Sequence, residues 1–143
     1  FDPIRGELFT ASKGAGAQLN GFRIRSSKAK ELGQTILATA LPYKNKESLP
    51  TYLESFRKIF FQAGDIRRCG SAALDLAYVA AGRYDGYWES GLKPWNIAAG
   101  ELLVRESGGL VTDFKGGNDP IQKGEIVAGS AKVVQTLVKH LKG

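Results

Sequence analysis

WNIAAG at residues 95–100, followed by ELLVRESGG at residues 101–109, is the stretch that decides the fold. Pro94 suits a first helical position and the apolar residues after it recur at helical spacing, so the pattern predicts a helix from Pro94 to Ser107. Asn96 then lies in the first turn, beside free backbone N–H groups and the positive end of the helix dipole. An acid there could bind a metal ion, whereas an amide offers only a weak, neutral oxygen.

Strands and helices are predicted to alternate on both sides of this helix. Residues 7–12 and 18–25 are short alternating runs around a Gly-rich turn, which indicates a hairpin. Further strands are predicted at residues 35–40, 65–69, 84–89, 110–114 and 125–128, and further helices at 48–62, 71–81 and 131–141. This alternation is typical of an α/β protein, and we expect a layered α-β-α sandwich with a mixed sheet.

Composition excludes several classes of protein. A chain of 143 residues with 43% hydrophobic and 24% charged residues fits one globular domain rather than a disordered segment. The chain has one cysteine, which excludes an internal disulfide framework. It also has one histidine, and one residue of each type is too few for a Cys/His zinc site. The formal charge of +6 is spread along the chain, so we expect a solvated surface and no direct nucleic-acid binding. No apolar run has the length of a membrane span, and we expect a cytoplasmic protein.

Several separated blocks carry a family resemblance. They are FDPIRGELF at 1–9, GAGAQLNG at 14–21, GSAALDLAYVAAG at 70–82, WNIAAG at 95–100 and IVAG at 126–129. Together they resemble the bacterial inositol monophosphatase family, whose second signature reads Trp-Asp-x-Ala-Ala-Gly before a helix ending in Glu-x-Gly-Gly. Asn96 stands where that signature has an acid. The resemblance implies the C-terminal half of the inositol monophosphatase and fructose-1,6-bisphosphatase-like fold, with residues 1–143 as one α/β subdomain.

The start of the chain suggests a longer polypeptide. The chain begins at Phe1 and contains no Met, and in the family a pair like Asp2-Pro3 falls near the middle of the protein. We therefore expect this chain to be the second half of a family member. The resemblance implies that the first half would carry an Asp-Pro-Leu-Asp-Gly-Thr loop and a Glu that supply most of the metal ligands.

The resemblance also implies a substrate-binding set. Gly70, Ser71 and Ala72 match the segment that lines the polyol ring of the substrate, although from the residues alone Ser71 suits a plain helix N-cap. Glu89 closes a predicted strand and would accept hydrogen bonds from polyol hydroxyls. Arg67 could hold a phosphate or a sugar hydroxyl, or form a structural or interfacial salt bridge, since the family dimerises near this region.

Other reactive side chains suggest no chemistry. Cys69 is expected to be a small buried residue, and His140 a surface residue of the last helix. Asp75 and Asp85 match no family site and are expected at the surface or in caps. Ser71 has no histidine near enough in sequence for a plausible triad, so a nucleophilic role is not expected.

These observations leave two functions open. The first is a magnesium-dependent phosphatase acting on inositol 1-phosphate and related sugar or polyol phosphates, in which this chain recognises the substrate and is inactive alone. Asn96 would mark a catalytic position whose Mg²⁺ binding is weakened, whether the substitution is natural or introduced. The alternative is a non-catalytic partner of transcription antitermination and rRNA expression proteins, a role that the resemblance also allows. We expect a homodimer in both cases.

Overall fold

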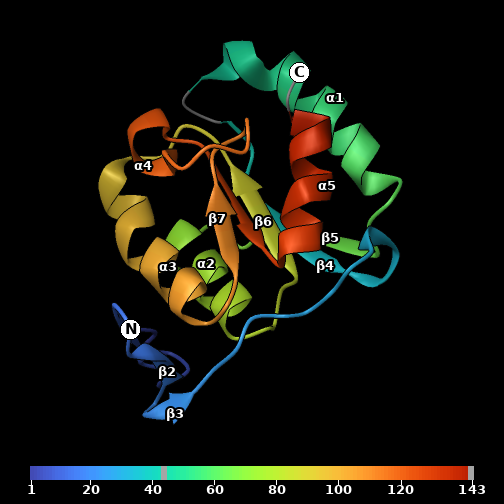
Figure 1. Ribbon diagram of the computed structural model, residues 1–143. Coiled ribbons are helices and arrows are strands. Elements are labelled where there is room, and N and C mark those ends of the chain that lie inside the picture. Colours follow the sequence, from blue (N-terminus) through green and yellow to red (C-terminus); the bar gives the residue numbers. More distant parts are fainter. Residues whose placement is uncertain (43–44, 142–143) are drawn as a thin grey trace.

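The computed structural model describes residues 1–42 and 45–141 (Figure 1). A small antiparallel sheet comes first, built from β1 (Phe9–Ser12), β2 (Gly16–Leu19) and β3 (Phe22–Arg23). The expected run over residues 18–25 is broken, because Asn20 and Gly21 both adopt positive φ and turn the chain between β2 and β3.

A five-stranded sheet forms the centre of the molecule. Its strands are β4 (Ile36–Thr39), β5 (Asp65–Arg67), β6 (Gly86–Glu89), β7 (Leu110–Thr112) and β8 (Ile126–Gly129), in the order β5-β4-β6-β8-β7. β4 runs parallel to β5 and β6, while β8 runs antiparallel to both of its neighbours, β6 and β7. The predicted mixed sheet is therefore confirmed, and every strand except β8 ends at the same edge.

Helices cover both faces of this sheet. In Figure 1, α2 (Ala72–Ala80) and α3 (Pro94–Glu106) lie on one face, and α1 (Leu49–Phe60) and α5 (Ala131–Leu141) lie on the other. Two 3₁₀ turns, Leu32–Gln34 and Lys46–Ser48, precede β4 and α1, and a short helix, α4 (Pro120–Lys123), precedes β8. The sequence analysis did not predict α4, which begins at a proline and ends at the left-handed Gly124. The expected α-β-α sandwich is confirmed.

Successive side chains of a strand point to opposite faces of the sheet and so contribute to two separate halves of the core. In β6, Tyr87 is buried on the α2–α3 side, and the next residue, Trp88, is buried on the α1–α5 side. β8 alternates in the same way, with Ile126 and Ala128 on one side and Val127 on the other. Because helices cover both faces, side chains on either side of these strands are buried, which explains why β8 appears in the sequence as a short continuous hydrophobic run.

Small residues let α2 and α3 pack closely. Leu76, Ala77 and Ala80 of α2 are buried, whereas Ala73 is exposed. Gly100 of α3 lies against Leu76 so tightly that an added Cβ would stand 2.6 Å from the Leu76 Cβ. The family-like WNIAAG stretch thus places a glycine where a larger side chain would push the two helices apart.

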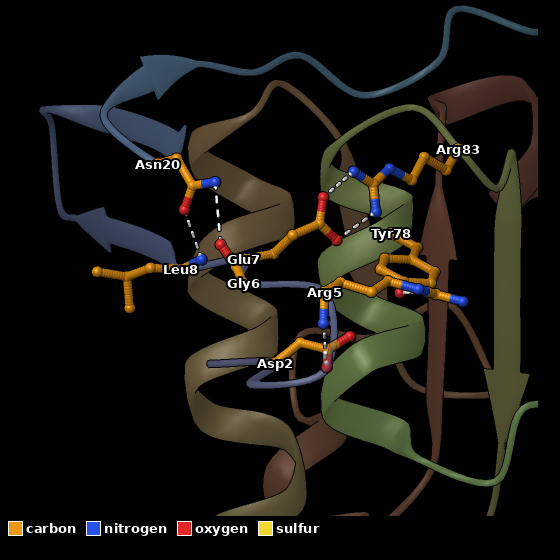
Figure 2. Close-up of polar contacts among 8 residues, drawn as sticks. All are labelled: Asp2, Arg5, Gly6, Glu7, Leu8, Asn20, Tyr78 and Arg83. Carbon is orange, nitrogen blue, oxygen red and sulfur yellow. Dashed lines mark hydrogen bonds and ion pairs between the residues drawn. The ribbon is translucent and has the colours of Figure 1, made fainter.

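Ionic contacts fasten the N-terminal segment to α2 and to the loop after it (Figure 2). Glu7 accepts two hydrogen bonds from the guanidinium of Arg83, which also lies over the ring of Tyr78 at 4.8 Å from its centroid. Arg5 donates to the Tyr78 hydroxyl, and the Asn20 side chain bridges the hairpin to the Gly6 and Leu8 backbone. The segment before β1 is therefore part of the fold.

Candidate functional site

A cavity of about 1140 Å³ opens at the edge where the parallel strands end. Its wall includes Ala40 after β4, Arg68 after β5, Glu89 at the end of β6, and Lys115 after β7. α1 and the N-terminal end of α3 add the remaining sides. Ligands of α/β proteins bind outside the carboxyl ends of strands, because loops and helix N-termini converge there. The position alone makes this cavity the candidate binding site.

Glu89 is the carboxylate of the cavity wall. It is half-buried, and one of its carboxylate oxygens accepts a hydrogen bond from the hydroxyl of Tyr87, two residues earlier on β6. Burial raises the pKa of Glu89 above its usual value, while the Tyr87 hydrogen bond acts in the opposite direction. Burial and the negative charge of Glu89 together raise the pKa of Tyr87, which therefore stays a donor. Tyr87 holds Glu89 in place as an acceptor, and the sequence analysis did not single it out.

Gly70 and Ala72 form the neighbouring part of the wall, while Ser71 between them does not line it. Gly70 has a φ of 84°, a backbone conformation that favours glycine, and it turns the chain from β5 into α2. The Ser71 hydroxyl oxygen accepts a hydrogen bond of 3.3 Å from the N–H of Leu74, so Ser71 is the N-cap of α2. The simple capping role considered for Ser71 is the one that its side chain performs.

Asn96 lines the cavity from the first turn of α3. Its side-chain oxygen accepts a hydrogen bond of 2.9 Å from the N–H of Lys93, and its own N–H donates to the Lys93 carbonyl at 2.9 Å. An amide supplies the acceptor needed for this cap as well as an acid would. The oxygen of the Asn96 side chain is thus used in the cap. The other polar atom of the side chain is an NH₂ group, which donates hydrogen bonds and does not bind cations.

The two adjacent arginines differ in position. Arg67 is exposed and pairs with Asp65, with 2.9 Å between its Nε and the carboxylate, and it does not line the cavity. Arg68, the next residue, does line it. Successive side chains of a strand end point to opposite sides, so only one of the two can face the cavity. Arg68, and not Arg67, is therefore the arginine of this pair that lines the cavity, and the ligand role of Arg67 stays a prediction.

Lys123 brings a cation from α4 to the same wall. Its ammonium lies 3.1 Å from the carboxylate of Asp113, which is buried and also accepts hydrogen bonds from the N–H groups of Lys115 and Gly117. Burial would raise the pKa of Asp113, but these donors, foremost the Gly117 N–H, outweigh it and lower the pKa. The sequence analysis missed this pair, because nothing in the local pattern links residues ten apart across an unpredicted helix.

Of three expectations about other side chains, those for Cys69 and Asp75 are wrong and the one for Asp85 is confirmed. Cys69 is exposed rather than buried, with its sulfur 2.7 Å from the Tyr84 hydroxyl. Asp75 is buried rather than at the surface. Asp85 does act as a cap, because its carboxylate accepts hydrogen bonds from the Ser27 hydroxyl and from the first N–H of β4.

The described residues do not make a magnesium site by themselves. In residues 1–42 and 45–141, no three side chains of His, Cys, Asp or Glu lie together in a way that could hold a metal ion. The one candidate ligand from the sequence analysis, Asn96, uses its oxygen as a helix cap. Magnesium in proteins is bound mainly through carboxylates, so the donor set of this chain does not fit it. In the same ranges, no helix is long and apolar enough to cross a bilayer.

The chain is thus an α/β protein with a cavity at the carboxyl ends of its strands, lined by the carboxylate of Glu89, by Gly70 and by the cationic residues Arg68, Lys115 and Lys123. Comparison with known proteins narrows this class. The sequence model of the inositol monophosphatase family matches residues 1–142, and the chain belongs to that family.

The relatives are proteins of about twice this length. Nus factor SuhB of Escherichia coli K12 is 56% identical over 142 residues, which are 99% of this chain and 53% of that protein. The SuhB structure from Bartonella henselae matches with a TM-score of 0.95 at 47% identity, over 99% of this chain and 54% of that one. SaIMPase-II of Staphylococcus aureus, solved with inositol monophosphate bound, matches with a TM-score of 0.87 at 26% identity, over 99% and 56%.

Proposed function

We propose that this chain is the polyol-recognition half of a phosphomonoester hydrolase, with inositol 1-phosphate and related sugar or polyol phosphates as its ligands. The observation that carries the proposal is the cavity at the carboxyl ends of the strands, in which Glu89 is oriented by Tyr87. Membership of the inositol monophosphatase family supports it, and so does the inositol monophosphate bound to SaIMPase-II.

The cavity wall suits such a ligand chemically. Glu89 can accept hydrogen bonds from vicinal hydroxyls, and the exposed backbone at Gly70 allows a ring to approach closely. Cationic groups from three different segments, Arg68, Lys115 and Lys123, line the same cavity and favour an anionic phosphate. Arg67 can contribute only through its charge, because its side chain is paired with Asp65 outside the wall.

The chain alone is expected to recognise the ligand without hydrolysing it. The family to which it belongs generally uses Mg²⁺, which neutralises phosphoryl charge and activates water. This chain spans about half the length of its relatives and has no carboxylate set for that ion in its described residues. We therefore propose binding of inositol 1-phosphate and no release of phosphate, with or without added magnesium.

The test is a titration of the chain with inositol 1-phosphate followed by calorimetry and by backbone NMR shifts. Glu89→Gln should weaken binding on the order of tenfold, because a charged hydrogen-bond acceptor becomes neutral. Glu125→Gln is the matched control, since Glu125 lines the same cavity, whereas the Tyr87 hydroxyl donates to Glu89. Absence of binding, or equal losses in both variants, would refute the recognition role.

A second candidate is a non-catalytic role with transcription-machinery proteins, favoured by the name Nus factor SuhB of the relatives at 56% identity. The neutral Asn96 also agrees with a protein whose binding surfaces, rather than catalysis, matter. Binding of the chain to purified RNA polymerase, unchanged by Glu89→Gln and by inositol 1-phosphate, would favour this function over recognition of a sugar phosphate.

We propose, in addition, that the chain forms a homodimer. Large apolar side chains are exposed on it, among them Phe22, Phe61 and Trp95, each with 76% or more of its surface accessible. Association of two copies would remove part of this apolar area from water. Sedimentation velocity over a range of concentrations tests the proposal, and a purely monomeric species at the highest concentration would exclude it.

A further inference from the structure

A second cavity, of about 400 Å³, lies at the edge of the central sheet opposite to the cavity that contains Glu89. β8 runs antiparallel to its neighbours, so it ends, and α5 begins, at the edge where β6 and β7 start (Figure 1). The wall comes from the linker between β3 and β4 (residues 25–28), from the turn after α3 (107–108) and from the start of α5 (130–131). No described residue lines both cavities, so the second cavity is not part of the proposed site.

Hydrogen bonds hold the linker against its neighbours. The N–H and the hydroxyl of Ser26 both donate to the carbonyl of Ser107, at 2.9 and 3.2 Å. The hydroxyls of Ser27 and Ser130 donate to the Asp85 carboxylate and to a linker carbonyl, respectively. Because a hydroxyl carries one hydrogen, the oxygens of these three serines can only accept a hydrogen bond from a ligand. The wall is therefore fixed, and its hydroxyls suit ligand groups that donate.

The charge of the second cavity is positive. Arg25 and Lys28 line it, and its described lining residues include no acid. Neither cation forms a salt bridge with a carboxylate in residues 1–42 and 45–141. The carboxylate of Asp85, behind Ser27, is occupied, because its two oxygens accept the Ser27 hydroxyl and the first N–H of β4. Unpaired cations at a cavity attract an anion, and a guanidinium can hold a phosphate through two hydrogen bonds.

The start of α5 adds positive potential to this cationic wall. Ser130 acts as the N-cap, since its hydroxyl oxygen accepts the N–H of Val133 at 3.3 Å. The N–H groups of Ala131 and Lys132 have no acceptor among the described residues, and Ala131 lines the cavity. Free N–H groups and the helix dipole favour an anion at this end, and Lys132 brings a further positive charge in the same turn. The linker cations and the helix end therefore act on one space.

We infer that the second cavity binds a small phosphomonoester that carries hydroxyl groups, with its phosphate at Arg25 and Lys28 and its hydroxyls at the serine oxygens. A volume of about 400 Å³ is within the range of small-molecule sites. The inference is independent of the proposed function, because it uses none of the residues that line the first cavity. A ligand in the second cavity would join the linker to the start of α5.

The test is an NMR titration of the chain with two probes, inorganic phosphate and glycerol 3-phosphate. With both probes, the backbone signals of Gly108, Ala131 and Lys132 should shift and saturate together. Glycerol 3-phosphate should bind more tightly, because it adds alcohol hydroxyls that the serine oxygens can accept. Glu89→Gln, which alters only the first cavity, should leave these shifts unchanged, so a failure of the proposed function is seen separately.

A double variant, Arg25→Gln with Lys28→Gln, removes both linker cations and keeps side chains that can donate hydrogen bonds. Binding of either probe at the second cavity should weaken by at least about tenfold, since charge-assisted hydrogen bonds are lost. Arg57→Gln with Lys58→Gln is the matched control. It removes the same two residue types from exposed positions of α1, outside both cavities, and should leave binding unchanged.

Three results would overturn the inference. The first is the absence of saturable shifts at Gly108 and at the start of α5. The second is an equal loss of binding in the two double variants, which would indicate a response to net charge rather than a site. The third is equal affinity for inorganic phosphate and glycerol 3-phosphate, which would contradict a ligand with hydroxyl groups. None of these results bears on the recognition role of Glu89.

Discussion

Asn96 caps the start of α3 but lacks the negative charge that an acid would have at this position. Its oxygen accepts the Lys93 N–H at the start of α3, so the helix begins where the sequence pattern predicts. An aspartate could make the same cap with one oxygen and keep the second, charged oxygen for the cavity. The asparagine keeps the helix start and removes only the charge.

We therefore predict that Asn96→Asp leaves the fold unchanged and increases the affinity of the chain for Mg²⁺, because a carboxylate is the ligand type that this ion prefers. Isothermal calorimetry with MgCl₂ measures the change. The parent should show no submillimolar binding, in agreement with the lack of a ligand set among the described residues. Submillimolar binding by the parent would contradict the prediction.

Arg67 and Arg68 make a different point at the same scale. They are neighbours in sequence and identical in chemistry, yet Arg67 pairs with Asp65 and Arg68 lines the cavity. The direction in which each side chain leaves the end of β5 decides this, and that direction depends on the register of β5 against β4.

At the scale of elements, the α2–α3 contact depends on Gly100. A Cβ at this position would meet the Leu76 side chain at 2.4 Å and its Cβ at 2.6 Å, which is closer than packed atoms allow. Replacing a helical glycine by alanine normally stabilises a helix by up to about 1 kcal/mol. Here the steric conflict between two helices opposes that gain.

Gly100→Ala should therefore destabilise the protein by about 1–3 kcal/mol, as overpacked cores do. Gly33→Ala is the control, because its nearest neighbour would be the Gln62 carbonyl at 4.0 Å. Urea denaturation of both variants and the parent measures the effect. A stabilised Gly100→Ala variant would mean that α2 and α3 can separate at little cost.

The N-terminal segment before β1 is held in place by side chains from α2 and from the loop after it. Arg83 donates to Glu7 and lies over Tyr78, so a loop residue after α2 secures residues far away in sequence (Figure 2). Arg83→Ala should release this segment and accelerate its cleavage in limited proteolysis. Arg57→Ala, which breaks an exposed pair with Glu54 on α1, should leave the cleavage rate unchanged. Equal rates in all three proteins would show that the contact does not hold the segment.

At the scale of the whole molecule, Asp75 links pH to stability. Folding raises its pKa from 3.8 to about 7, so between these values the folded state keeps a proton that the unfolded state has lost. The contribution of this residue to the free energy of unfolding therefore falls as the pH rises from about 4 to about 7, and is constant above that. Each pKa unit corresponds to about 1.4 kcal/mol.

Asp75→Asn removes this dependence, so its stability relative to the parent should increase by about 2–4 kcal/mol between about pH 4 and about pH 8. Denaturation curves at both pH values, with Asp119→Asn as the exposed control, measure the difference. Since any packing cost of the amide is the same at both pH values, it cancels. A difference that does not depend on pH would show that Asp75 titrates normally in the folded state.

Local pattern alone determined most of the elements and their order, with the short helix α4 as an exception. Backbone conformation at three places follows from residues that are close in sequence. These places are the helically spaced residues after Pro94, the alternating run before Asn20 and the β-rich stretch at residues 35–40. The same local patterns, repeated in separated blocks, identified the family and named six candidate site residues. Gly70, Ala72, Glu89 and Asn96 among them do line the cavity.

Only the tertiary structure decided the environment of the remaining side chains. Asp75 becomes a buried acid because α2 is packed between the sheet and α3, and Cys69 stays exposed although cysteines are usually buried. Tyr87 meets Glu89, and Lys123 meets Asp113, through contacts that depend on strand pairing and on a helix that the sequence did not reveal. Burial, charge coupling and cavity walls are properties of segments brought together from distant parts of the chain, so no local pattern encodes them.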